Sequence, residues 1–201
     1  MSGAAGARGM GVKVVGLWAF WALLLVGLCG CTGVQSMLPV STTAPHGADP
    51  VMPADRVRGP HAVIAVIDGD TISVERDDER VKVRLIGIDT PETQDRRTGV
   101  QCFGAEASEH AKQLLTGQSV YLEQDPSQDS RDQYGRELAY VWTTSGQLVN
   151  LMLISAGFGH EYTYDLPYRY QAQFRSAESD ARANGRGFWS PATCNGDTGA
   201  G

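Results

Sequence analysis

Two short acidic motifs each follow an apolar run that is typical of a strand. The first is IDGDT (Ile67–Thr71) and the second is IGIDTPET (Ile86–Thr93). Asp70 and Asp89 offer hard anionic oxygens, and the main-chain carbonyl of Thr90 could add a neutral one, a ligand type that suits calcium rather than zinc. So few protein ligands leave room for waters and a phosphate. Each aspartate taken alone is also compatible with an ordinary turn, since Asp-Gly is a common hairpin pair.

These acidic motifs belong to a larger set. VRLIGIDTPET (Val83–Thr93) contains the second of them, and RDQYGRELAYVW (Arg131–Trp142) and EYTY (Glu161–Tyr164) follow. The patterns D-G-D-T, R-x-x-x-x-D-T-P-E and D-x-Y-G-R, in this order, resemble the staphylococcal nuclease, or thermonuclease, family from about Gly59 to Pro191. The resemblance implies an α+β fold, an OB-fold-type five-stranded barrel with about three packed helices. It also implies Ca2+-dependent cleavage of DNA and RNA, single-stranded or flexible, that leaves 3′-phosphorylated products.

The resemblance also implies roles for individual side chains. Arg84 and Arg136 match the arginines that hold the scissile phosphate, and a guanidinium can bind two phosphate oxygens at once. The alternative for both is a structural pairing with nearby acids. Glu92 would deprotonate or orient the attacking water, because an ordinary glutamate is ionised at neutral pH. Asp68 is expected to act indirectly, through a water or by shaping the turn.

Three tyrosines are expected at the substrate. By resemblance, Tyr134, Tyr162 and Tyr164 stack on or hydrogen-bond a base and its terminal phosphate, and such stacking tolerates any base. The alternative for a lone tyrosine is a half-buried surface position. Two departures from the family stand here. Gln133 replaces a lysine, which removes one phosphate contact, and the segment around EYTY is one residue short, so the choice of Tyr162 over Thr163 assumes a gap.

The elements that must position these residues follow from the apolar pattern. Residues 61–68, 71–76 and 81–88 show β-branched residues in alternation and predict a three-strand meander. Strands are also expected at 119–124 and 137–142. Helices are expected at 103–117, with one apolar stripe, at 146–158, and at 169–189, where Gly185 ends the helix. Five strands with interspersed helices favour a small closed barrel.

Both ends of the chain are predicted to lie outside the folded domain. Residues 1–30 combine Arg8 and Lys13 with a long apolar run, which indicates an export signal. The run ends in LCGC (Leu28–Cys31), which resembles a bacterial lipobox, so Cys31 is the expected lipidation site and a lipid-anchored protein of the cell envelope is predicted. A plain secreted protein and a retained membrane helix are the alternatives. Residues 31–58 predict a flexible tether, 59–191 the nuclease-like domain, and 192–201 a flexible tail.

Charge and cysteine content limit what else the chain can be. Apolar residues make up 42% and charged residues 20%, which is ordinary for a globular protein. Removing residues 1–30 takes away two basic residues and no acid, so the formal charge changes from −6 to −8, and any nucleic-acid site must be local. Cys102 and Cys194 remain after export, where a disulfide is expected. We expect a monomer with no protein partner. The rival functions are a non-catalytic binding module and a peptide-binding envelope adaptor.

Overall fold

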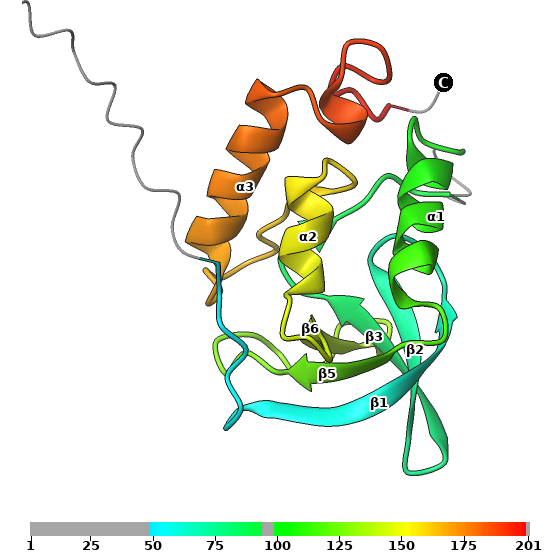
Figure 1. Ribbon diagram of the computed structural model, residues 1–201, viewed down its shortest axis with the longest axis vertical. Coiled ribbons are helices and arrows are strands. Elements are labelled where there is room, and N and C mark those ends of the chain that lie inside the picture. The colour runs from blue at the N-terminus through cyan, green and yellow to red at the C-terminus, as the bar shows by residue number, and fades with distance from the viewer. Residues whose placement is uncertain (1–48, 94–98, 200–201) are drawn as a thin grey trace, which may run out of the picture. The chain divides into compact units, whose positions relative to one another are not determined.

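Five strands close into a barrel. The structure, a computed structural model, describes residues 49–93 and 99–199. The strands follow one another around the barrel in the order β1-β2-β3-β6-β5 (Figure 1). Their bounds are Val57–Val66 (β1), Thr71–Arg76 (β2), Glu79–Leu85 (β3), Ser119–Glu123 (β5) and Glu137–Thr143 (β6). Neighbouring strands are antiparallel except β3 and β6, which pair in parallel.

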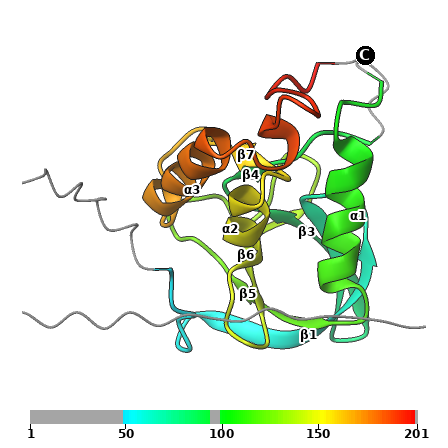
Figure 2. The same cartoon turned by 45° about the horizontal axis from the view of Figure 1, so that its top comes forward.

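Helices and a small second sheet accompany the barrel. The helices are α1 (Gly104–Leu115), α2 (Val149–Ser155), α3 (Gln171–Ala183) and the 3-10 helix η1 (Gly187–Trp189). Strand β4 (Ile88–Asp89) pairs with β7 (His160–Glu161). Helix α2 contacts β6 and α3, and it lies between α1 and α3 in both views (Figures 1 and 2). A closed five-stranded barrel with three α-helices confirms the predicted OB-type α+β fold.

Strand β3 follows the expected alternation and carries the first catalytic candidate. Val81, Val83 and Leu85 are buried, whereas the alternating residues Arg80 and Lys82 are exposed. Because successive side chains of a strand point to opposite faces, Arg84 shares the outer face with Arg80 and Lys82. The inner face packs against β2, where Ile72 lies opposite Val83 and Val74 lies opposite Val81.

The expected strand over residues 81–88 is interrupted. Strand β3 ends at Leu85, and Gly87 adopts a φ of +76°, which favours glycine. A side chain at Gly87 would also come within 2.6 Å of the Tyr168 ring. The chain therefore turns before β4 begins at Ile88, and after this turn Asp89 bonds back to Arg84 of β3.

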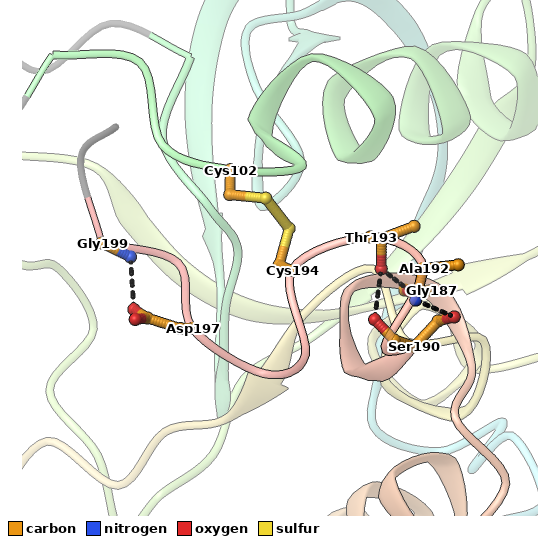
Figure 3. The surroundings of a disulfide bond; sticks show 8 residues. All are labelled: Cys102, Gly187, Ser190, Ala192, Thr193, Cys194, Asp197 and Gly199. Atoms are coloured by element: carbon orange, nitrogen blue, oxygen red, sulfur yellow. Dashed lines mark hydrogen bonds between the residues drawn. A yellow bond between two sulfur atoms is a disulfide. The ribbon is translucent and has the colours of Figure 1, made fainter.

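The two ends of the domain are longer than expected. Strand β1 starts at Val57, two residues before the predicted boundary, and Arg56 in the expected tether pairs with buried Glu123 at 3.3 Å. At the other end, a disulfide joins Cys102 to Cys194, residues 191–196 form turns, and the N–H of Gly199 donates to Asp197 Oδ1 at 2.9 Å (Figure 3). The disulfide and local hydrogen bonds thus tie the segment from residue 192 to Gly199 to the domain, and its predicted flexibility stays a prediction.

The predicted export signal, Cys31 and most of the tether lie outside the described residues. Within residues 49–93 and 99–199, no helix is both long enough and apolar enough to cross a bilayer.

Candidate active site

A cleft of about 840 Å³ lies on the outer side of the barrel, where β3, β4 and two loops meet. It gathers most of the predicted site residues: Arg84, Asp89, Glu92, Tyr134, Arg136, Tyr162 and Tyr164. Asp70 and Thr90 do not line it. Both are buried; Asp70 contacts Arg84, which lines the cleft, and Thr90 bonds to Asp70.

Asp70 occupies the turn between β1 and β2 and is bonded through both oxygens. Its Oδ1 accepts from the Thr71 hydroxyl at 3.1 Å, and its Oδ2 accepts from the backbone N–H and hydroxyl of Thr90 at 3.0 and 3.2 Å. Thr90 also explains the glycine in IDGDT, because a Cβ at Gly69 would lie 2.6 Å from the Thr90 hydroxyl. Asp68 Oδ1 accepts from the N–H of Asp70 at 3.1 Å, so Asp68 shapes the turn.

Arg84 links the two acidic motifs. Its Nε lies 3.1 Å from Asp70 Oδ1, and its Nη2 donates to Asp89 Oδ1 at 2.8 Å. Its Nη1 donates to the carbonyls of Leu85 and Ile88 at 2.8 and 2.6 Å. All three guanidinium nitrogens thus have protein partners. This is the arrangement expected if Arg84 pairs structurally with nearby acids. Arg84 still lines the cleft and places its positive charge there.

Arg136 is held by the turn that the D-x-Y-G-R motif forms. Asp132 Oδ1 accepts from the backbone N–H groups of Tyr134 and Arg136, both at 2.9 Å, and its Oδ2 accepts from Arg136 Nε at 2.6 Å. Arg136 Nη1 donates to the Thr71 hydroxyl at 3.2 Å, and Nη2 makes no hydrogen bond with the described residues. One nitrogen is therefore available to an anion. The guanidinium also lies 5.4 Å from the centre of the Tyr134 ring.

Negative charge is concentrated around the two acidic motifs. Burial and the charge of Asp70 raise the pKa of Asp68 to about 7. Burial raises the pKa of Asp89 as well; Arg84 opposes this shift and Asp70 adds to it. His160 Nε2 is 3.9 Å from Asp89 Oδ2. Among the described residues no three His, Cys, Asp or Glu side chains form a cluster that could hold a metal ion. The oxygen donors present, with the Asp89 side chain 38% exposed, fit a hard cation that keeps most of its waters.

Glu92 is positioned through its backbone by the start of α1. Its N–H donates to Gln101 Oε1 at 2.8 Å, and its carbonyl accepts from the N–H of Gln101 at 3.0 Å. Gly104, the first residue of α1, packs so closely on the Glu92 carbonyl that a side chain there would overlap it. The Glu92 side chain is exposed and borders the cleft.

The three predicted tyrosines form an exposed aromatic border. Tyr134 is 72% exposed, Tyr164 77% and Tyr162 42%. The rings of Tyr162 and Tyr164 lie 6.4 Å apart. Thr163 points elsewhere, because its hydroxyl bonds to Glu161 and accepts from Gln171 Nε2 at 2.6 Å. The structure therefore places Tyr162, and not Thr163, at the cleft.

Comparison with known proteins assigns the family. The family model of staphylococcal nuclease homologues matches residues 82–191. The chain belongs to the staphylococcal nuclease family. Thermonuclease of Staphylococcus hyicus is 42% identical over 130 residues, 65% of this chain and 75% of the relative. Thermonuclease of Staphylococcus intermedius is 40% identical over 134 residues, which are 66% of this chain and 78% of the relative. Endonuclease YncB of Bacillus subtilis is 38% identical over 125 residues, which are 62% of this chain and 58% of the relative. The protein is therefore a nuclease, a hydrolase of nucleic acids.

Sequence reasoning overlooked three residues that orient the nuclease site. Thr71 connects Asp70 to Arg136, Asp132 orients Arg136, and Gln101 holds the Glu92 backbone. Asp132 could have been found, since an aspartate four residues before an arginine in a Gly-containing turn is placed to cap that turn. Nothing in the sequence around Gln101 indicates its contact.

Proposed function

We propose that this nuclease requires calcium and hydrolyses phosphodiester bonds of DNA and RNA to leave 3′-phosphorylated products. The observation that supports it is the gathering of Asp89, Glu92 and two arginines at one cleft, with buried Asp70 bonded to Arg84 beside them. Asp70, Asp89 and the Thr90 carbonyl would hold the cation. Bound there, calcium would neutralise phosphate charge and orient water.

In this proposal the chain's own residues divide the work. Arg136 binds the phosphate through Nη2, which the protein leaves unbonded among the described residues, and stabilises negative charge that develops on phosphorus oxygens. Arg84 adds a second positive charge and fixes the distance between Asp70 and Asp89. Glu92 accepts a proton from the attacking water or aligns it. Expulsion of the 5′ oxygen leaves the phosphate on the 3′ side. The enzyme acts as a monomer.

The alternative of a non-catalytic binding module predicts loss of the arginine or glutamate positions. Arg84, Glu92 and Arg136 are all present, and all three border the cleft. The relatives at 38–42% identity are named as nucleases, which favours catalysis over a binding module or an envelope adaptor.

The test is cleavage of single-stranded DNA and of RNA with calcium, with magnesium and with chelator, followed by analysis of the product ends. Glu92→Gln keeps the size of the side chain and removes the base, so turnover should fall by about a hundredfold or more while oligonucleotide binding survives. Asp89→Ala should weaken both calcium binding and cleavage. Glu106→Gln, an exposed change of the same kind in α1, serves as the matched control. Equal rates with calcium and with chelator, or products ending in 3′ hydroxyls, would refute the corresponding part of the proposal.

We also propose that the chain is exported and lipid-anchored at Cys31. Cys31→Ser should release the protein from the membrane fraction or leave it unprocessed, and Cys29→Ser, two residues away, should not. Mature protein that still carries residues 1–30 would exclude this anchor and favour a retained membrane helix.

A further inference from the structure

A second hollow, of about 340 Å³, continues from the active-site cleft along the outer face of β3. The two hollows share Arg131, Tyr134 and Arg136 in their linings, so they form one continuous surface. The second hollow adds Arg80 and Lys82 from the same outer face of β3 that carries Arg84. We name this second hollow, with Arg80, Lys82 and Arg131, the cationic groove.

Arg80, Lys82 and Arg131 form no ion pair with the described residues, although Arg131 Nη1 donates to the Gly135 carbonyl at 2.8 Å. Most arginines of the described residues pair with a carboxylate. Within residues 49–93 and 99–199, the basic side chains without an ion pair are Arg58, Arg80, Lys82, Lys112 and Arg131. Three of these five line the groove, whereas Arg58 and Lys112 lie on β1 and α1. Unpaired cations gathered in one hollow are the local feature that phosphate binding needs.

We propose that the cationic groove binds backbone phosphates of the strand that flanks the scissile bond. The proposal rests on the proposed nuclease function and extends its substrate site beyond one nucleotide on each side of the cut. Side chains two residues apart on a strand are about 6.6 Å apart. That step is comparable to the spacing of successive phosphates along an extended single strand, so Lys82 and Arg80 are placed to meet consecutive phosphates beyond the cleft.

Two features favour a nucleic-acid strand over an acidic peptide in the groove. The groove is continuous with the cleft, so a strand bound there leads directly to the scissile phosphate. Tyr134 stands where the two hollows meet, 72% exposed, and offers a face on which a base can stack. Glu79 is the acidic residue of the groove lining, and it lies beyond Arg80. The track of positive charge therefore ends at Arg80.

The experiment compares substrate length. The double variant Arg80→Gln/Lys82→Gln and the control Arg58→Gln/Lys112→Gln lose the same charge, but only the first pair lines the groove. For a single-stranded substrate of about 12 nucleotides, within the ~4 to 16 that an OB fold covers, kcat/KM of the groove variant should fall about fivefold to tenfold. For the groove variant, the slope of log kcat/KM against log salt concentration should become less negative by about 1.4. Each lost contact to a single-strand phosphate removes about 0.7 from this slope. A dinucleotide should be cleaved at the wild-type rate by both pairs.

The outcomes separate this inference from the proposed function. If the wild type cleaves neither substrate, the nuclease proposal fails with it. If the wild type cleaves both and the groove variant equals the control pair at both lengths, the groove inference alone is overturned. The same holds if the groove variant also loses the dinucleotide, because the change would then have disturbed Arg84. A short polyglutamate added as competitor tests whether the groove binds an acidic peptide instead. Inhibition that depends on Arg80 and Lys82, without a length effect on DNA, would assign the groove to an acidic peptide.

Discussion

Gly104 is the position where the smallest possible change should disturb catalysis without touching a charged group. A methyl group there, in Gly104→Ala, would lie 2.9 Å from the carbonyl carbon of Glu92, 3.1 Å from the carbonyl oxygen of Pro91, and nearer still to the Glu92 oxygen. Ordinary carbon contacts begin at about 3.5 Å. The backbone of Glu92 must therefore move by roughly 0.5 to 1 Å.

That displacement sets the expected size of the effect. Misplacing a catalytic group by about 1 Å can reduce the rate by about a hundredfold. Stability should fall only moderately, because alanine favours the helix by up to about 1 kcal/mol over glycine, which offsets part of the about 1 to 3 kcal/mol that crowding of this kind costs. We therefore expect kcat to fall by ten- to a hundredfold, with the free energy of unfolding reduced by at most about 2 kcal/mol.

The assay is calcium-dependent cleavage of single-stranded DNA beside urea unfolding of the same preparations. Ala105→Gly, at the next and exposed position of α1, is the matched control. It should cost up to about 1 kcal/mol of stability and leave kcat unchanged, since it leaves Gly104, the residue that packs on the Glu92 carbonyl, in place. If Gly104→Ala is folded and cleaves within twofold of the wild type, the close packing of α1 on Glu92 does not position this residue for catalysis.

Two further predictions concern stability. Cys102→Ser/Cys194→Ser removes a disulfide between residues 92 positions apart, so the free energy of unfolding should fall by about 4 to 5 kcal/mol. The melting temperature should fall by about 10 to 20 °C, with cleavage retained at 25 °C. An unchanged melting temperature would contradict this. For Asp125, burial raises the pKa, but hydrogen bonds from Tyr140 and from the N–H groups of Arg169 and Ser127 outweigh it, so the pKa lies below its ordinary value. The ionised carboxylate stabilises the fold above the unfolded pKa of about 3.9, and this contribution is lost as the pH falls through the folded pKa. Asp125→Asn should therefore lower the urea midpoint clearly at pH 7 and much less in acid, and an equal loss at both pH values would argue against this account.

The local pattern of the chain was sufficient to predict most of the barrel. Alternation in RVKVRL (Arg80–Leu85) predicts which side chains face inward, and the structure agrees. Pairing of β3 with β6 was not predictable from local pattern, because these strands are parallel and far apart in sequence. The two-residue strands β4 and β7 are too short to leave a periodic signal.

The candidate site was predictable as a set of residues but not as a set of contacts. The motifs place Asp70, Asp89 and Arg84 near one another, yet no spacing indicates that Arg84 bonds both carboxylates and two carbonyls. Such bonds depend on the turn at Gly87, which brings the Ile88 carbonyl back toward β3. The contacts of the C-terminal segment were not predictable for a related reason. Composition alone suggests a loose tail, whereas its attachment comes from a disulfide to a residue 92 positions earlier.

The acidic balance of the chain, a formal charge of −6, does not oppose binding of a polyanion at this site. Charges more than about 8 Å apart are largely screened at physiological salt, so a bound phosphate responds to the side chains that line the cleft and the cationic groove. Those linings bring together five cations, of which Arg84 and Arg136 pair with Asp89 and Asp132. The full set of charged side chains in the linings is Arg80, Lys82, Arg84, Arg131 and Arg136 with Glu79, Asp89, Glu92, Asp129, Asp132 and Asp165. The remaining acidic residues act mainly at low ionic strength, where the field of the whole protein governs how often a strand arrives. Net charge therefore bears on the rate of encounter, while the unpaired cations along β3 determine which part of the surface holds the strand.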